Sequence, residues 1–120
     1  DFLREVAESA DCLILLDVNN AFVSARNHAF DPVTFIDAMP AARVRQIHLA
    51  GHFDRGDVII DTHDQPVCGD VMELYAYTAG RLGPVPTMIE RDDDMPGLAE
   101  LAAELAVVRS IGEQVWERAA

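Results

Sequence analysis

The chain has 120 residues and a mass of 13.2 kDa, the size of one domain, and half of its residues are hydrophobic, enough to bury a core. Its formal net charge is -12 and all nine basic residues are arginine, a balance that disfavours nucleic acid or an anionic membrane as a partner. No apolar run approaches the ~18 residues of a membrane span and the first residues do not resemble a signal peptide, so we expect a soluble, cytoplasmic protein whose sequence starts as if cut within a longer one.

The first half of the chain predicts two helices and two strands. Apolar residues at helical spacing indicate a helix over residues 2–9, and the continuous run Leu13–Leu16 is typical of a parallel strand covered on both faces. Residues 21–31 are expected to be a loop long enough to fold over a site. Asp31 and Pro32 predict a helix start, and the apolar residues of 43–51 predict the second strand.

The second half continues the alternation of strands and helices. A helix is predicted over residues 71–82, a strand over 85–89 and an amphipathic helix from Leu98 onward. Three strand–helix repeats indicate parallel β-α units. Three units cannot close a (β/α)8 barrel, so an open piece should expose sheet edges and inward-facing apolar side chains. Either a segment absent from this sequence or another copy of the chain would then cover them.

Each predicted strand ends in a side chain that can bind a metal ion. These residues are Asp17, His48 and Glu90. The carboxyl ends of parallel strands meet at one edge, where α/β folds place their chemistry, so the three side chains are expected to converge on a polar site. The alternative for the first strand is that Asp17 or Asn20 only caps the following turn.

A second candidate cluster follows Val58, Ile59 and Ile60. On an extended backbone the side chains of Asp61 and His63 would leave from one face and share a cation. Imidazole with carboxylates suits iron, manganese or zinc better than calcium. The alternative is a solvated loop in which Asp61 and His63 are merely hydrogen-bonded to each other.

Several segments together resemble the multinuclear non-haem iron-dependent oxidases, a family also known as domain of unknown function 692 that includes oxidases of methanobactin and thiaglutamate biosynthesis. The segments are Leu-Leu-Asp-Val-Asn-Asn (15–20), Asn-His-Ala-Phe-Asp-Pro (27–32), Gln-Ile-His-Leu-Ala-Gly-His (46–52), Ile-Asp-Thr-His-Asp (60–64) and Arg-Leu-Gly-Pro-Val-Pro-Thr-Met-Ile-Glu-Arg-Asp-Asp-Asp (81–94). The resemblance implies a TIM barrel of the xylose-isomerase-like kind. Residues 1–120 would form a single partial barrel domain, about the last three β-α units, with the N-terminal units absent.

The resemblance also implies roles for individual residues. The implied metal ligands are Asp17, Asn20, His48, Asp61, His63 and Glu90, holding two or three irons in the complete family site. His52 and Asp92 match positions beside the site, where catalytic proton transfer is the implied role, and His28 is a further candidate of that class. Other ligands of the family lie on earlier strands that this sequence does not contain.

The implied reaction is the oxidation of a cysteine in a ribosomally made peptide with dioxygen, assisted by a small partner protein that recruits the peptide. One alternative is a metal-dependent isomerase or phosphodiesterase of the wider barrel superfamily, using zinc or manganese. Another is a non-catalytic truncated fragment that folds as an oligomer. Cys12 and Cys68 form no C-x-x-C pair, and we interpret them as small buried residues.

Overall fold

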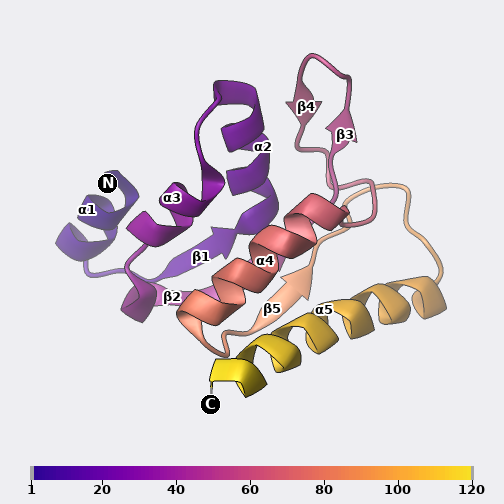
Figure 1. The fold of residues 1–120 in the computed structure, drawn as a ribbon. Helices are drawn as coiled ribbons and strands as arrows, with labels where there is room; N and C mark the ends of the chain where they lie inside the picture. The colour runs from indigo at the N-terminus through magenta and orange to yellow at the C-terminus, as the bar shows by residue number, and fades with distance from the viewer. Residues whose placement is uncertain (1, 120) are drawn as a thin grey trace.

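The computed structural model describes residues 2–119, which form a mixed α/β structure (Figure 1). The helices of these residues are α1 (Phe2–Ser9), α2 (Val18–His28), α3 (Pro32–Ala38), the short 3-10 helix η1 (Ala41–Arg43), α4 (Gly69–Leu82) and α5 (Leu98–Ala119). The strands are β1 (Ile14–Asp17), β2 (Val44–Leu49), β3 (Phe53–Asp54), β4 (Ile59–Ile60) and β5 (Thr87–Ile89). The predicted helices at both ends, the helix after Asp31 and the three main strands are confirmed.

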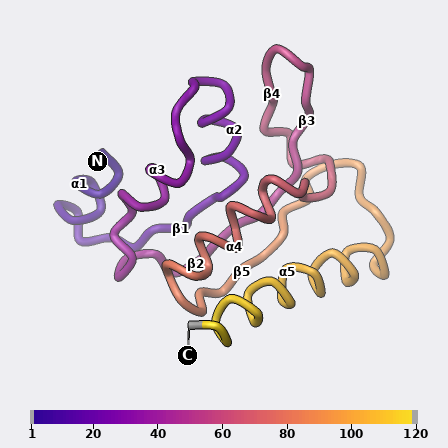
Figure 2. Tube along the Cα trace, in the orientation of Figure 1, coloured from indigo at the N-terminus to yellow at the C-terminus, as the bar shows by residue number. Residues whose placement is uncertain are grey.

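The main sheet has the strand order β1-β2-β5, and both of its pairings are parallel. Asp17 lies beside His48, and His48 lies beside Met88 on the other neighbour, so the strands end at the same edge. This confirms the parallel arrangement expected from the alternation of strands and helices. The tube in Figure 2 shows the three strands running side by side toward the end of the molecule that carries the remaining two strands.

Strands β3 and β4 form a separate antiparallel hairpin that the sequence did not predict (Figure 1). The side chain of Asn27 anchors it to α2: Nδ2 donates to the carbonyl of Ile59 at 2.8 Å, and the amide of Ile59 donates to Oδ1 at 2.9 Å. Asn27 thus satisfies the backbone of β4 in the way a neighbouring strand would. The hairpin connects β2 to the segment of Asp61 and His63, so its anchoring helps to place that segment.

The prediction of a loop over residues 21–31 is wrong, because most of this segment belongs to α2. Asp17 is the N-cap of this helix, and its carboxylate accepts a hydrogen bond from the amide of Asn20 at 2.8 Å. The helix ends where Ala29 adopts a left-handed conformation with φ 55°. Polar residues interrupt the apolar residues of α2 that pack on the sheet. The sequence of this segment therefore shows no clear helical period.

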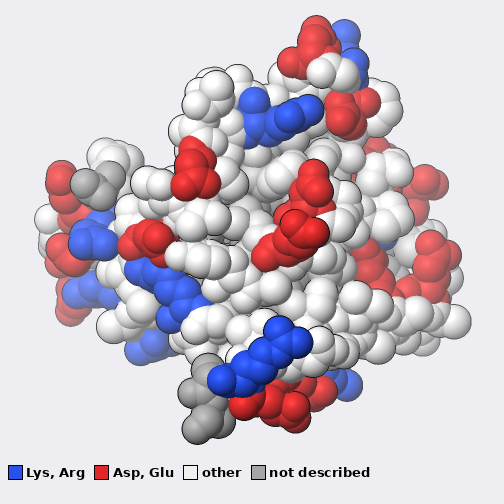
Figure 3. All heavy atoms as spheres, in the orientation of Figure 1, with Lys and Arg blue, Asp and Glu red and all other residues white. Residues whose placement is uncertain are grey.

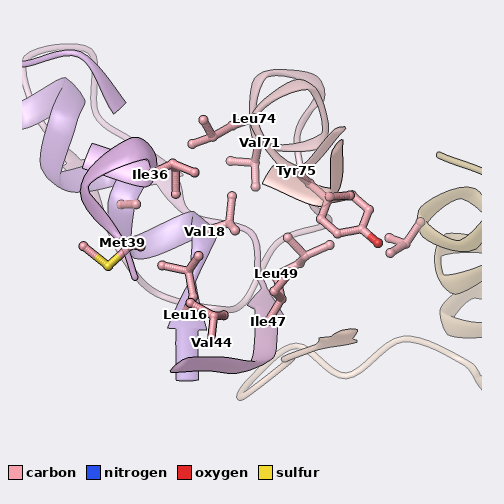
Figure 4. Close-up of a cluster of buried hydrophobic side chains, with 13 residues drawn as sticks. Leu16, Val18, Ile36, Met39, Val44, Ile47, Leu49, Val71, Leu74 and Tyr75 are labelled. Carbon is pink, nitrogen blue, oxygen red and sulfur yellow. The ribbon is translucent and has the colours of Figure 1, made fainter. Parts of the chain in front are cut away.

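The core lies between one face of the sheet and the helices α2, α3 and α4, with α5 packed on α4 (Figure 4). Its side chains come from the strands and from helix faces with apolar residues at helical spacing. The buried members are Leu16, Val18, Ala21, Ile36, Met39, Val44, Ile47, Leu49, Val71, Leu74, Tyr75, Ala79 and Val108.

The opposite face of the sheet is not covered by the described residues. Leu13 and Leu15 of the first strand segment and Met88 of β5 are exposed there, with Leu15 at 52%. The prediction that β1 is covered on both faces is therefore wrong for this chain, whereas the exposure of apolar side chains expected for an open piece of barrel is confirmed. Within the chain, only alternate residues of the apolar run meet a helix.

Charged side chains are spread over the surface in Figure 3, where Asp and Glu atoms gather at the right of the view, over the connection from β5 and the start of α5. Among the described residues, no helix has the length and apolar character to cross a membrane.

The interpretation of both cysteines as buried is wrong, because Cys12 is exposed and Cys68 is half-buried.

Candidate metal centre

The ends of the three parallel strands bring Asp17, His48 and Glu90 together. One possible ligand atom from each of them lies within 4.8 Å of the other two. Nδ1 of His48 is 2.7 Å from Oε1 of Glu90, and the amide of Glu90 donates to the carbonyl of Leu49 at 2.8 Å, which continues the pairing of β2 and β5 past the strand ends. The convergence expected from the sequence follows from this register, since the parallel strands place their last residues at one edge.

His63 adds a second imidazole to the same cluster, and carboxylates surround its ring. Nε2 lies 2.9 Å from Oδ1 of Asp61 and 3.9 Å from Oδ2 of Asp17. Nδ1 lies 3.3 Å from Oε2 of Glu90 and 3.4 Å from Oδ2 of Asp92. Four carboxylates therefore meet around one histidine, an arrangement of like charges that a bound cation would stabilise.

The backbone of His63 differs from the extended conformation assumed from the sequence. Strand β4 ends at Ile60, and His63 has a positive φ of 54°, which is uncommon outside glycine. Its amide donates to the carbonyl of Gly51 at 3.2 Å, and its carbonyl accepts from the amide of Asp92 at 2.8 Å. Asp61 and His63 therefore meet because the chain turns and both neighbouring segments hold it, not because they alternate along a strand.

Gly51 is required where it stands, because the chain from Asp61 onward crosses it closely. A Cβ atom built on Gly51 would lie 2.0 Å from the carbonyl oxygen of Gln65. Such an overlap can be relieved only by moving backbone. Gly51 thus allows the segment of His63 to lie directly against the end of β2.

Asn19, which sequence reasoning missed, is completely buried and holds the other side of the site. Its Nδ2 donates to the carbonyl of Gly51 at 3.3 Å and, through a short hydrogen bond, to Oδ1 of Asp61. Asn20 donates to Oδ2 of the same carboxylate at 3.0 Å. Two adjacent amides thus fix both oxygens of Asp61. An asparagine in the first turn of a helix ordinarily indicates a cap, so no local pattern distinguished Asn19 from Asn20.

His52 is linked to this network through Asn19. Its Nδ1 lies 2.8 Å from Oδ1 of Asn19, and its ring stacks on Phe22 with centroids 5.4 Å apart. Because the amide nitrogen of Asn19 already donates to Gly51 and Asp61, its oxygen is the acceptor toward His52. This hydrogen-bond network assigns the proton to Nδ1 of His52 and leaves Nε2 as an acceptor.

Burial raises the pKa of Asp17, and the nearby carboxylates of Asp61 and Glu90 raise it further. The amide of Asn20 and the ring of His63 act in the opposite direction. The sequence left two roles open for Asp17, and the structure shows both. Asp17 caps α2, and its carboxylate faces the cluster.

The residues fit a metal ion in two respects. First, Nε2 of His48 is buried and has no hydrogen-bond partner among the described residues, as expected for a nitrogen that would bind a cation. Second, two imidazoles with several carboxylates form the donor set of iron, manganese or zinc. The site is open enough for a ligand to approach, since the side chain of Asp92 is 72% exposed.

The structure brings together most of the residues singled out in the sequence. Asp17, Asn20, His48, Asp61, His63, Glu90 and Asp92 form one cluster, and His52 reaches it through Asn19. His28 does not join it, because it is exposed in the last turn of α2. His28 is the last residue of α2, and a basic residue at a helix C-terminus ordinarily favours the helix dipole.

Comparison with known proteins gives a family match over nearly the whole chain. The family described as "RiPP precursor modification enzyme MbnB/TglH/ChrH" matches residues 1–113. Among curated proteins, a UPF0276 protein of Caulobacter vibrioides is 55% identical over 109 residues, covering 91% of this chain and 39% of the relative. A UPF0276 protein of Anaeromyxobacter sp. is 56% identical over 104 residues, covering 87% of this chain and 37% of the relative.

A more distant UPF0276 protein, from Pseudomonas aeruginosa, is 47% identical over 118 residues, which cover 98% of this chain and 42% of the relative. The chain therefore spans about two fifths of the length of the curated relatives that it matches.

Proposed function

Because the chain belongs to the MbnB/TglH/ChrH family of enzymes that modify precursors of ribosomally made peptides, we propose that it is part of a metal-dependent oxidase acting on a peptide cysteine. The observation that carries the proposal is the convergence of Asp17, His48 and Glu90 at the ends of three parallel strands. Metal sites rely on donors whose orientation is held by the surrounding protein.

The proposed metal ligands are Asp17, Asn20, His48, Asp61, His63 and Glu90, and the proposed metal is iron, with two or three ions in the complete site. When bound, iron would supply a binding position for a substrate thiolate and the activation of dioxygen. The structure supports this reading through the carboxylates that surround His63 and through the unpartnered nitrogen of His48.

The protein's own residues would orient the ligands and handle protons. Asn19 and Asn20 hold both oxygens of Asp61, which fixes the direction in which its remaining lone pairs point. His52, with its proton assigned to Nδ1, would accept a proton at Nε2. The exposed carboxylate of Asp92, on the solvent side of His63, would contact the incoming peptide or exchange protons with water.

We further propose that the three-stranded sheet is the last part of a TIM barrel of the xylose-isomerase-like kind, and that residues 1–120 make up a single partial domain of it. The uncovered sheet face, with Leu15 and Met88 beneath the metal centre, would become the barrel interior. Earlier strands would then supply the further ligands. The proposed partners are the peptide substrate and a small protein that recruits this peptide. The proposed location of the protein is the cytoplasm.

Elemental analysis of the anaerobically purified protein, at its encoded full length, tests the metal. We expect iron in an amount at or above that of the protein, and His48→Ala and Glu90→Ala should lower it while the circular dichroism spectrum is retained. His28→Ala is the matched control, because it removes a histidine that lies outside the cluster, and it should leave the metal content unchanged.

Other results would point elsewhere. Zinc or manganese in place of iron would favour a metal-dependent isomerase or phosphodiesterase, which the same donor set can serve. Equal metal content in the wild type, His48→Ala and Glu90→Ala would contradict the site. A full-length protein that takes up no metal would favour a non-catalytic role.

A further inference from the structure

Glu104 of α5 contacts both segments that carry the second half of the metal centre. Its Oε1 accepts a hydrogen bond from the amide of Val67 at 2.6 Å, at the end of the segment that begins with Asp61. Its Oε2 lies 3.3 Å from Nη2 of Arg91, the residue directly after Glu90. A single carboxylate thus joins the two segments at a second place, in addition to the hydrogen bond from the amide of Asp92 to the carbonyl of His63.

The pair of Arg91 and Glu104 is almost entirely removed from solvent, with side-chain exposures of 6% and 13%. Nε of Arg91 is buried without a hydrogen-bond partner among the described residues, and Nη2 of Arg91 forms an ion pair with Glu104. Removing one member of a buried ion pair leaves an uncompensated charge, so the local structure depends on both.

Arg91 also lies between two residues that face His63. The carboxylates of Glu90 and Asp92 approach the ring of His63, while the guanidinium of Arg91 reaches away from it to α5. Neighbouring side chains of an extended segment leave from opposite sides, so anchoring Arg91 fixes the direction of the other two. Glu104 itself stands on a long helix that packs on α4, which makes it a firm anchor.

We propose that Glu104 is a positioning residue of the metal centre, which holds the segment of His63 in register with the segment of Glu90. The inference rests on the proposed function as a metal-binding protein. It assigns to α5, which contributes no ligand, the task of keeping the ligands of two loops at binding distance.

The test compares Glu104→Ala with Glu100→Ala in the protein at its encoded full length. Glu100 is exposed one turn earlier on the same helix, so the control removes the same charge without breaking the contacts to Val67 and Arg91. Amide hydrogen exchange of the metal-free protein should show Val67 exchanging about tenfold faster or more in Glu104→Ala, because a charged acceptor is lost. Titration with Mn²⁺ should show an affinity lower by about 10–100-fold. Glu100→Ala should resemble the wild type in both measurements.

Glu104→Gln separates the two contacts and also serves if Glu104→Ala does not fold. Its amide oxygen can still accept from Val67, so exchange of that amide should stay near the wild-type rate. The loss of charge opposite Arg91 should nevertheless weaken Mn²⁺ binding, a split that a purely structural role of the Val67 contact would not give.

Unchanged Mn²⁺ affinity in both Glu104 variants would overturn the inference, as would exchange of Val67 at the wild-type rate in Glu104→Ala. A wild-type protein that binds neither Mn²⁺ nor Fe²⁺ would instead contradict the proposed function. The exchange measurement would still decide in that case whether Glu104 holds the segment after Asp61.

Discussion

Asp17 has two roles in the folded protein, and its charge matters mainly for the second. As the N-cap of α2 it accepts a hydrogen bond from the amide of Asn20, which an ionised or an amide side chain can do equally well. As a member of the cluster it lies among the carboxylates of Asp61 and Glu90, and burial together with these charges raises its pKa. In the metal-free protein, therefore, the charge of Asp17 opposes folding.

We predict that Asp17→Asn raises the melting temperature of the metal-free protein at neutral pH while it lowers metal binding. The folded protein holds the proton of Asp17 more tightly than the unfolded chain, so ionisation of Asp17 as the pH rises costs stability. Asparagine keeps the cap and removes this cost. Calorimetry of metal-free samples at several pH values measures the effect, and the gain should shrink as the pH is lowered toward the range where Asp17 is protonated.

The control for this prediction is Asp31→Asn, a second N-cap whose carboxylate is fully exposed and accepts from Val33 and Thr34. Its hydrogen bonds lower the pKa of Asp31, so its ionisation favours folding and the substitution should not stabilise the protein. A melting temperature that falls equally in both variants would contradict the prediction, because it would show that the ionisation of Asp17 favours folding as that of Asp31 does.

At the scale of the element, strand β1 shows how far an apolar run can be interpreted. Leu15 and Leu16 look equivalent in the sequence, yet Leu16 is 3% exposed in the core whereas Leu15 is 52% exposed on the uncovered face. Alternation along a strand puts neighbours on opposite faces, and the described helices cover one face of this sheet. The sequence therefore identified the strand, but not which of its leucines stabilises this chain.

Leu16→Ala should lower the free energy of unfolding of the 120-residue chain by ~2–5 kcal/mol, the usual range for a large-to-small change in a core. Leu15→Ala should cost much less in that chain, because its side chain leaves no comparable cavity. Urea denaturation followed by circular dichroism measures both. Equal losses for the two variants would mean that something covers Leu15 in solution, such as a second copy of the chain.

Helix α2 shows the opposite case, because the sequence predicts a loop where the structure has a regular helix. The sequence indicates a possible cap at Asp17, but residues 21–31 lack a clear apolar period at helical spacing. Tertiary contacts, rather than an apolar period, hold this helix in place. Asn19 is buried against the site, and Asn27 forms hydrogen bonds with the hairpin. Polar residues on the packed face of a helix weaken its pattern in the sequence, because their partners lie on other elements.

For the molecule as a whole, the uncovered sheet face is the main feature left without a partner among the described residues. Leu13, Leu15 and Met88 are exposed on or beside it, and the same face leads to His48 and Glu90 at the strand ends. Exposed apolar side chains on one face of a sheet can mark an interface. The relatives are more than twice as long as this chain, which supports the proposal that further strands cover it.

We predict that residues 1–120, expressed alone, bind the dye ANS and associate in solution. Leu13→Thr/Leu15→Thr should reduce both effects, since threonine suits a strand but is polar. Val107→Thr is the matched control, because Val107 is an exposed apolar residue of helix α5. Fluorescence and light scattering provide the measurements. A monomer that binds no dye would contradict the partial barrel.

The sequence by itself determined the main elements, the parallel order and the residue types at the three strand ends, because periodicity, caps and strand ends are local properties. It also determined the family, through segments spread along the chain. Only the tertiary structure decided that α2 is a helix, that Asn19 holds Asp61, and that Glu104 joins the segments of His63 and Glu90. These contacts join residues 13 to 42 positions apart, and no local pattern encodes which distant partner a buried polar side chain will meet.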